Sequence, residues 1–401
     1  MHVLIAPDSF TGTLTAAQAA HAVADGWARH APADRLELLP LSDGGPGFVD
    51  VLASALPGSL ELITVPGPLG GPTPAQVLLA RPDGSTGGST DGALVAYVES
   101  AQACGLHLVP PGRRDPGVTS TRGVGELVAA ARAAGAGRVV VGLGGSGTND
   151  GGAGLLAALL AGGGSRVGPR VHPRVDPRVV SRLAAGGEAL LGITAGELEG
   201  LAALRADWAG VELVAASDVD VPLLGFHGAS AGFAEQKGAT PEQAQRLERA
   251  LGDFAAAACD AAGVPRSLAR EPGAGAAGGL GFALLLLGAR RVPGAAAVLE
   301  AVGLRERVAA ADLVVTGEGT FDWQSLRGKV VSAVAAVGLE LGTPVVVLAG
   351  QVLVGRREAL AIGVESAYPV ADGPAQVAAA LADPAGTLAA RAERVARTWS
   401  R

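Results

Sequence analysis

A glycine-rich segment with the composition of an anion-binding loop spans residues 142–152. It follows an apolar run at residues 139–141 and precedes another at 155–160, so the pattern predicts a strand, a glycine loop and a helix. The free backbone N–H groups of such a loop and the positive end of the helix attract anions. We therefore expect a nucleotide phosphate to be bound by Gly144, Gly145, Ser146, Thr148 and Asn149.

Asp150 adds a carboxylate to this loop, and a carboxylate beside a phosphate can hold Mg²⁺. The loop also has the spacing G-x-G-x-x-G, which would suggest a dinucleotide site. That interpretation needs an acidic residue about 20 positions later, and none occurs between Asp150 and Asp176. Alternatively, the glycines only allow a strand and a helix to pack closely.

Lysine is rare in this chain, which has only Lys237 and Lys329. A lysine ammonium is a compact charge that can follow a phosphoryl group, whereas the arginine fork holds a fixed geometry. We expect both lysines to face phosphate or carboxylate groups, Lys237 in substrate binding and Lys329 in catalysis. The alternative is that both are ordinary surface lysines. No Walker phosphate loop surrounds either residue.

Carboxylates collect where apolar runs end, at Asp8, Asp43, Asp218, Asp220, Glu318 and Asp322. In a doubly wound sheet, the loops after parallel strands meet at one edge. Kinases use carboxylates there to hold Mg²⁺ and to accept the proton of the attacking hydroxyl. A single Asp can equally cap a helix or form a turn, so the hypothesis depends on their convergence.

Strands and helices that could position these residues alternate along the chain. Apolar runs at residues 3–6, 36–41, 139–141, 312–316 and 344–349 predict strands of a parallel α/β sheet. The predicted helices cover residues 16–29, 155–160 and 326–341, and a last helix starts at residue 375. We expect a discontinuous doubly wound domain of residues 1–72 and 290–401, a second inserted α/β domain of residues 73–289, and a substrate cleft between them.

Composition argues against several classes of protein. The 31 basic and 38 acidic residues give a formal net charge of −7, and no basic cluster suggests nucleic acid as a partner. Cys104 and Cys259 are the only cysteines, which predicts a cytoplasmic protein without a disulfide framework. The first residues do not resemble a signal peptide, and the apolar stretch at residues 272–289 indicates a loop and a buried helix, so no membrane segment is predicted. The histidines lack zinc-ligand spacing, and the composition is compatible with a homo-oligomer.

Motifs along nearly the whole chain resemble, in order, those of the type-1 glycerate kinase family. They lie at residues 5–10 (IAPDSF), 41–45 (LSDGG), 120–127 (STRGVGEL), 142–152, 217–220 (SDVD), 236–239 (QKGA), 273–282 (GAGAAGGLGF) and 316–329 (TGEGTFDWQSLRGK). The resemblance implies a flavodoxin-like domain. It also implies transfer of the γ-phosphoryl group of ATP, with Mg²⁺, to D-glycerate, giving 2-phosphoglycerate.

The resemblance further implies roles for single residues. Those implied to be catalytic are Asp8, Asp218, Asp322 and Lys329; Ser9 and Asp43 bind substrate, and Asp150 and Glu318 hold the metal. The usual family pattern is not kept at Thr11, Pro46, Val221, His227 and residues 330–331. A kinase of another small hydroxy acid, or a metabolite-binding pseudokinase of the same fold, is therefore an alternative.

Overall fold

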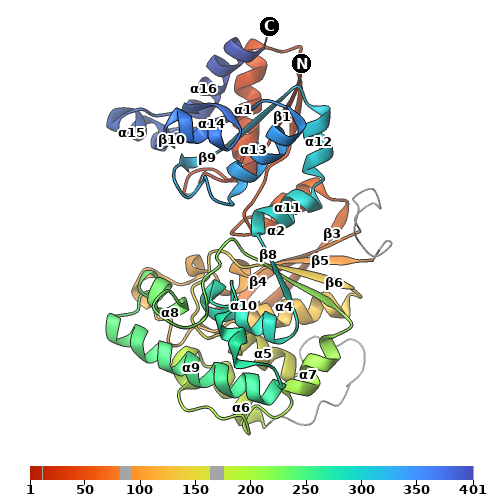
Figure 1. Cartoon of the computed structure of the whole chain (residues 1–401), viewed down its shortest axis with the longest axis vertical. Coiled ribbons are helices and arrows are strands. Elements are labelled where there is room, and N and C mark those ends of the chain that lie inside the picture. Colours follow the sequence, from red (N-terminus) through yellow and green to blue (C-terminus); the bar gives the residue numbers. More distant parts are fainter. Residues whose placement is uncertain (11, 82–92, 163–175, 401) are drawn as a thin grey trace. The chain divides into compact units, whose positions relative to one another are not determined.

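The computed structural model describes residues 1–10, 12–81, 93–162 and 176–400. The chain divides into two compact units (Figure 1). Unit 1 contains Met1–Asp43, Asp50–Leu56 and Ala295–Arg401, and unit 2 contains Gly44–Val49 and Pro57–Gly294. Thr11, one of the positions that differ from the family pattern, lies outside the described residues.

Unit 1 is built on a five-stranded sheet in which every neighbouring pair of strands is parallel. Its strands are β1 (His2–Ile5), β2 (Arg35–Leu38), β9 (Leu313–Phe321), β10 (Val345–Val352) and β11 (Val364–Pro369). The spatial order β2-β1-β9-β10-β11 is the order 2-1-3-4-5 when the strands are numbered within the unit. This is the strand order of flavodoxin-like folds, so the predicted fold class is confirmed for this unit.

Helices cover both faces of this sheet (Figure 1). They are α1 (Ala16–His30), most of α2 (Phe48–Ala55) and of α11 (Gly294–Ala301), α12 (Leu304–Ala310), α13 (Val330–Leu341), α14 (Arg356–Ala361), α15 (Pro374–Ala382) and α16 (Pro384–Trp399). Helices α1 and α16 pack against each other and share one core with alternate strand residues such as Val3, Ile5 and Val315. Helices α12 and α13 contact β1, β9 and β10 from the opposite face.

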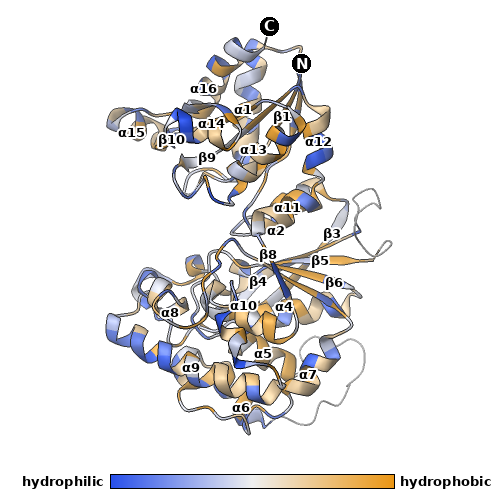
Figure 2. Ribbon diagram, viewed as in Figure 1, coloured by the Kyte–Doolittle hydropathy of each residue, from blue (hydrophilic) through white to orange (hydrophobic). Residues whose placement is uncertain are grey.

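Unit 2 contains a six-stranded mixed sheet in the order β3-β4-β5-β6-β7-β8. The strands are β3 (Gly58–Pro66), β4 (Pro72–Ala80), β5 (Val95–Glu99), β6 (Arg138–Gly142), β7 (Glu212–Ala216) and β8 (Arg290–Val292). Strands β3, β4 and β5 pair antiparallel, whereas β5 to β8 pair parallel. Strands β5 and β6 are strongly hydrophobic along their length (Figure 2), as expected for parallel strands buried on both faces.

The connections of unit 2 are helical. The α-helices are α3 (Ala101–Cys104), α4 (Arg122–Ala133), α5 (Ala153–Leu160), α6 (Pro177–Leu183), α7 (Leu201–Trp208), α8 (Ala229–Phe233), α9 (Pro241–Ala262) and α10 (Ala276–Leu286). Short 3₁₀ helices are η1 (Leu106–Leu108), η2 (Pro111–Arg113), η3 (Gly187–Leu190), η4 (Glu235–Lys237) and η5 (Arg266–Arg270). No helix of the described residues is long and apolar enough to cross a membrane.

The boundary between the units differs from the predicted one at both ends of the insertion. Residues 57–72 were expected in the first domain, but β3 pairs along its whole length with β4 of unit 2. Residues 290–294 also belong to unit 2, because β8 pairs with β7. The predicted last helix is two helices, since Asp383 and Pro384 interrupt the chain between α15 and α16.

Candidate functional site

Acidic side chains gather at the carboxyl edge of the unit 1 sheet. Beyond β1, the backbone N–H groups of Ala6 and Asp8 donate to the carbonyl oxygens of Val315 and Gly317, at 2.7 and 2.8 Å. Asp8 is thereby held beside Glu318 of β9. The segment after β2 is tied to the same edge by a 2.9 Å hydrogen bond from Leu41 N–H to Pro7 O, two residues before Asp43. We call Asp8, Asp43, Glu318 and Asp322 the acidic cluster.

The environment raises the pKa of Asp8 to about 7. Burial is the largest cause, and the neighbouring carboxylates of Asp43 and Glu318 add to it by repulsion. A 2.6 Å hydrogen bond from Ser9 N–H to Asp8 Oδ1 and the charge of Lys329 act in the opposite direction without cancelling the effect. Asp8 can therefore exchange a proton near neutral pH.

Glu318 is 8% exposed, and burial is the main reason why its pKa is raised. Interaction with Ser325 and Lys329 opposes this increase, while Asp322 and Asp43 reinforce it. Among the described residues, no hydrogen-bond donor contacts Glu318 Oε1. A buried carboxylate oxygen without a donor, in a cluster of excess negative charge, fits a cation ligand.

Lys329 occupies the N-cap position of α13. The predicted helix over residues 326–341 is shorter in the structure because Gly328 has φ +77°, which ends any helical path through it. No side chain caps α13, so its first N–H groups, beginning at Val330, remain available to a ligand. Lys329 and this helix end together provide positive charge beside the acidic cluster.

Asp322 has a local structural role. Its Oδ1 accepts a 2.8 Å hydrogen bond from Gln324 N–H, and its own N–H donates to Ser325 Oγ at 3.1 Å. These bonds close a turn immediately after β9, so the carboxylate shapes the loop that leads to Lys329. Ser325 was not predicted as a site residue, although it belongs to the motif at residues 316–329; it is 0% exposed and contacts both Asp322 and Glu318.

The glycine loop belongs to unit 2 and is accessible only at its tip. Gly145 is exposed and Gly144 and Ser146 are half-buried, whereas Thr148 and Asn149 are 0% exposed. Asn149 donates to Ser230 Oγ at 2.9 Å, which anchors the loop to α8. The tip could therefore contact a phosphate, but the burial of Thr148 and Asn149 does not fit their predicted contact with it.

Asp150 does not fit its predicted role as a metal ligand. It is 0% exposed, and its Oδ2 accepts hydrogen bonds from Thr121 N–H, Thr121 Oγ1 and Gly154 N–H at 2.8, 2.8 and 3.2 Å. Its Oδ1 accepts a 3.0 Å bond from Gly152 N–H. Burial is the largest cause acting on its pKa, which remains raised despite these donors. The carboxylate joins the start of α5 to the start of α4, which is a structural function.

Lys237 supports the glycine loop from beneath. It is 3% exposed, and its Nζ donates to Thr148 O at 2.7 Å and to Ser146 Oγ at 3.2 Å. Burial lowers the pKa of its ammonium group to about 8. The predicted direct contact with substrate does not fit this burial, whereas a role in holding the loop does.

The second glycine motif, at residues 273–282, packs directly against the first. Gly278 O accepts a hydrogen bond from Gly151 N–H at 2.9 Å. Gly278 has φ +67°, and a Cβ atom there would lie 1.9 Å from Thr148 O. This close backbone contact accounts for the glycine at position 278 without a dinucleotide.

Asp218 accepts a hydrogen bond from another residue of unit 2. Its Oδ1 accepts a 2.8 Å hydrogen bond from Gly294 N–H, at the first residue of α11. In the same way Glu99, which was not predicted, accepts from Gly47 N–H and Val49 N–H at the start of α2. Six predicted residues thus lie in unit 1 (Asp8, Ser9, Asp43, Glu318, Asp322 and Lys329), and the remaining eight lie in unit 2.

A carboxyl sheet edge with acidic side chains, a lysine and an open helix end is typical of α/β proteins that bind phosphorylated ligands or nucleotides there. The Glycerate kinase family model matches residues 3–400. The glycerate kinase of Bacillus subtilis (strain 168) is 39% identical over 375 residues, which cover 93% of this chain and 91% of the relative. The glycerate 2-kinase of Escherichia coli (strain K12) is 37% identical over 351 residues, covering 87% and 85%.

A crystal structure described as that of glycerate kinase 2 from Salmonella typhimurium LT2 has the same fold. Its TM-score is 0.77 at 34% identity, covering 99% of this chain and 98% of that one. This chain belongs to the glycerate kinase family. It is therefore a phosphotransferase that acts on a hydroxyl group, with ATP as the phosphoryl donor. These matches do not favour a different hydroxy acid or a pseudokinase.

Proposed function

We propose that this protein transfers the γ-phosphoryl group of ATP to the 2-hydroxyl of D-glycerate and releases 2-phosphoglycerate and ADP. The observation that carries the proposal is the group of Asp8, Asp43 and Glu318 beside Lys329 at the open end of α13. The family match and the name of the Escherichia coli relative, a glycerate 2-kinase, support the choice of substrate and position.

Asp8 is the proposed general base. A pKa of about 7 lets its carboxylate accept a proton at neutral pH without binding it too tightly. As the glycerate oxygen bonds to the γ-phosphorus, the bond from that phosphorus to the bridging oxygen of ADP breaks. The hydroxyl proton passes to Asp8. Ser9, half-buried beside it, is the proposed hydrogen-bond partner of glycerate.

Lys329 and the N-terminus of α13 are proposed to bind the transferred phosphoryl group. The ammonium is a mobile point charge, and the helix end adds N–H donors on the same side. Most phosphoryl-transfer catalysis is positioning and charge stabilisation, so this contact should matter more in the transition state than in binding.

Glu318 and Asp43 are the proposed carboxylates for Mg²⁺. The free Oε1 of Glu318 and the repulsion within the acidic cluster favour a cation there. The described residues contain no group of three or more His, Cys, Asp or Glu side chains placed to hold a metal. Mg²⁺ often uses only one or two protein carboxylates, with water and phosphate as its other ligands. When bound, it would neutralise charge on the phosphate oxygens.

In unit 2, we propose that Gly144, Gly145 and Ser146 present donors to an anionic group of a substrate, and that Lys237 positions this tip. The exposure of the tip and the two hydrogen bonds from Lys237 Nζ support these roles. Cys104 and Cys259 are free thiols, which suits the proposed cytoplasmic location.

The direct test is incubation of the protein with D-glycerate, ATP and Mg²⁺, followed by ³¹P NMR, which separates 2- from 3-phosphoglycerate. We expect 2-phosphoglycerate, and loss of product in the Asp8→Asn variant. Product at the 3-position would refute the proposed regiochemistry. The assignment of D-glycerate as the substrate would be refuted if no phosphoglycerate formed at high enzyme concentration. It would also be refuted if the protein efficiently phosphorylated only a different hydroxy acid.

A further inference from the structure

Trp323 differs from the other tryptophans of the chain. It is 63% exposed, whereas Trp27 and Trp208 are 0% and 3% exposed. Trp27 and Trp399 donate their indole N–H to Asp34 and Tyr368, and an arginine stacks on Trp208. Among the described residues, Trp323 has no hydrogen bond or ring contact. A large aromatic surface is therefore left open to a ligand.

The loop that carries Trp323 is held in place by hydrogen bonds. Asp322, which precedes Trp323, accepts a hydrogen bond from Gln324 N–H and donates its own N–H to Ser325 Oγ, both after Trp323. Arg327 N–H donates to Gln324 O at 3.0 Å. The indole is thus presented from an ordered turn. A ligand that stacks on it would not have to order this loop first.

A second exposed apolar side chain comes from the neighbouring strand. Val352 of β10 pairs with Phe321 of β9, and Leu353 N–H donates to Phe321 O at 2.8 Å. Leu353, the residue that follows β10, is 62% exposed. Because β9 and β10 are adjacent and parallel, Trp323 and Leu353 leave the sheet at the same edge.

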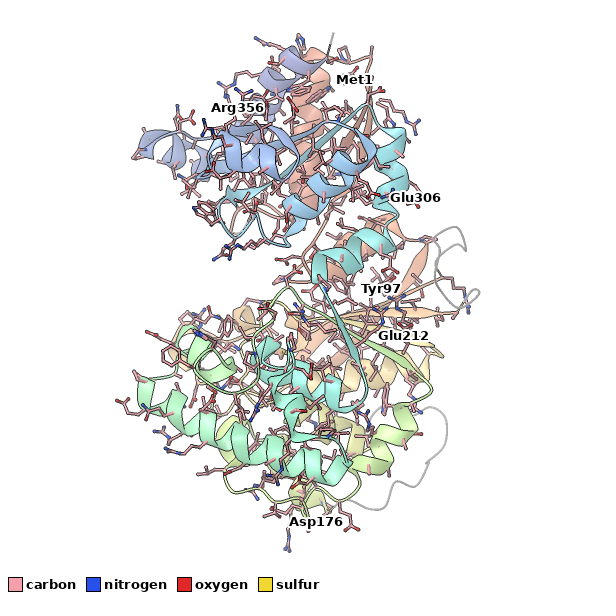
Figure 3. All side chains as sticks on the ribbon, viewed as in Figure 1. Met1, Tyr97, Asp176, Glu212, Glu306 and Arg356 are labelled. Carbon is pink, nitrogen blue, oxygen red and sulfur yellow. The ribbon has the colours of Figure 1, made fainter. Side chains whose placement is uncertain are left out.

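Three arginines follow these two side chains in the sequence. Arg327 follows Trp323 in its loop, and Arg356 and Arg357, both exposed, begin α14 just after Leu353 (Arg356 is labelled in Figure 3). None of these three arginines forms an ion pair among the described residues. We call Trp323, Leu353, Arg327, Arg356 and Arg357 the β9–β10 rim.

The rim combines a flat apolar surface with three arginines that have no ion pair within the described part of the chain. It adjoins the acidic cluster through the strand order β10-β9-β1. A ligand with an aromatic base and a polyphosphate chain matches this arrangement. We infer that the rim is the subsite for the purine base of ATP, which stacks on Trp323 against Leu353 while its γ-phosphate reaches Lys329. This inference rests on the proposed use of ATP as phosphoryl donor.

The test separates the base from the phosphates by comparing ADP with inorganic pyrophosphate, both measured by isothermal titration calorimetry with Mg²⁺. Trp323→Ala should weaken ADP binding about 5- to 140-fold, the equivalent of the about 1–3 kcal/mol typical of base stacking at 1.4 kcal/mol per tenfold. Pyrophosphate binding should not change. Trp323→Phe should restore much of the ADP affinity, because the ring can still stack.

Turnover provides the second measurement. Trp323→Ala should raise KM for ATP while kcat and KM for glycerate stay close to the wild-type values. Leu381→Ala removes an equally exposed apolar side chain of α15, 62% exposed, and serves as the matched control. It should change neither constant.

Equal ADP affinity in wild type and Trp323→Ala would overturn the base subsite while leaving the proposed kinase reaction intact. Equal loss of ADP and pyrophosphate affinity would also overturn it, since the residue would then act on the phosphates or the fold. Dissociation of an oligomer by Trp323→Ala, seen by analytical ultracentrifugation with ADP affinity unchanged, would assign the surface to a second copy instead. Failure of the wild-type protein to phosphorylate glycerate would instead refute the proposed function.

Discussion

Asp8→Asn should make unit 1 more stable at and above neutral pH while abolishing turnover. Asp8 has a pKa of about 7 in the folded protein against 3.8 for the free side chain. Between these values the folded state keeps a proton that the unfolded state has lost, so stability falls as pH rises through this window. Asparagine keeps the shape and can still accept from Ser9 N–H, but it carries no charge.

The size of the effect follows from the shift. About three pKa units correspond to about 4 kcal/mol at most, because each unit is worth about 1.4 kcal/mol. Asp8 keeps some contact with solvent, which reduces this figure, and we expect about 1–3 kcal/mol at pH 8 and less than half as much at pH 5. For a unit of this size the gain at pH 8 corresponds to about 3–9 °C in Tm.

Thermal unfolding of both proteins in EDTA, at several pH values from 5 to 8, measures this difference. Asp43→Asn should act in the same direction, because Asp43 is the strongest charge raising the pKa of Asp8. Asp50→Asn, at an exposed position of α2, is the control and should change stability by less than about 0.5 kcal/mol. A stability difference that does not vary with pH would refute the raised pKa, and a stabilised variant with full turnover would refute the role of Asp8 as base.

Three further substitutions address the remaining parts of the molecule. Lys329→Ala should lower kcat/KM at least about 10- to 100-fold and leave Tm unchanged, since a charge-assisted contact is worth about 1.5–3 kcal/mol. An unchanged rate would make Lys329 an ordinary surface residue. Asp150→Asn should destabilise unit 2 by about 3 kcal/mol or more, because the amide of the asparagine must face donors that bind a carboxylate in the wild type. A normal Tm together with a weakened Mg²⁺ dependence of turnover would restore the metal role of Asp150. Gly278→Ala should lower the free energy of unfolding by about 2–4 kcal/mol, measured by thermal unfolding. Gly263 has a similar φ of +68° but no atom within 4 Å of the new Cβ, so Gly263→Ala should lower it by only about 1–2 kcal/mol. Equal losses would refute the packing explanation.

The parallel strands could be predicted because their signal is local. Runs such as residues 139–141 and 344–349 are apolar over their whole length, as strands buried on both faces must be. Strand β3 gives no such signal, because most of its residues are exposed at a sheet edge. The predicted boundary, after residue 72, therefore lies 16 residues later than the observed one, after residue 56. Its assignment depends on pairing with β4, which a pattern search does not detect.

The site residues could be predicted where their position depends only on where a strand ends. Asp8, Asp43 and Glu318 were expected to converge because each follows or ends an apolar run, and unit 1 brings them together. Asp150 also follows a strand and a glycine loop, but its partner Thr121 lies 29 positions earlier in the chain. Whether a carboxylate meets solvent or four buried donors depends on such distant contacts, which motif spacing does not contain.

Unit 1 is assembled from segments near the two ends of the chain, which has a consequence for how the protein is made. Thr316 Oγ1 donates to Ala6 O across 310 positions of sequence, and β1 pairs with β9 over a similar separation. At about 5–20 residues per second, a ribosome needs about 15–60 s between these strands. Unit 2 can fold during this time, while β1 and α1 have no sheet to join. The apolar strand β1 and helix α1 must meanwhile avoid other partners. A permuted chain in which residues 1–56 follow α16 would not have this requirement.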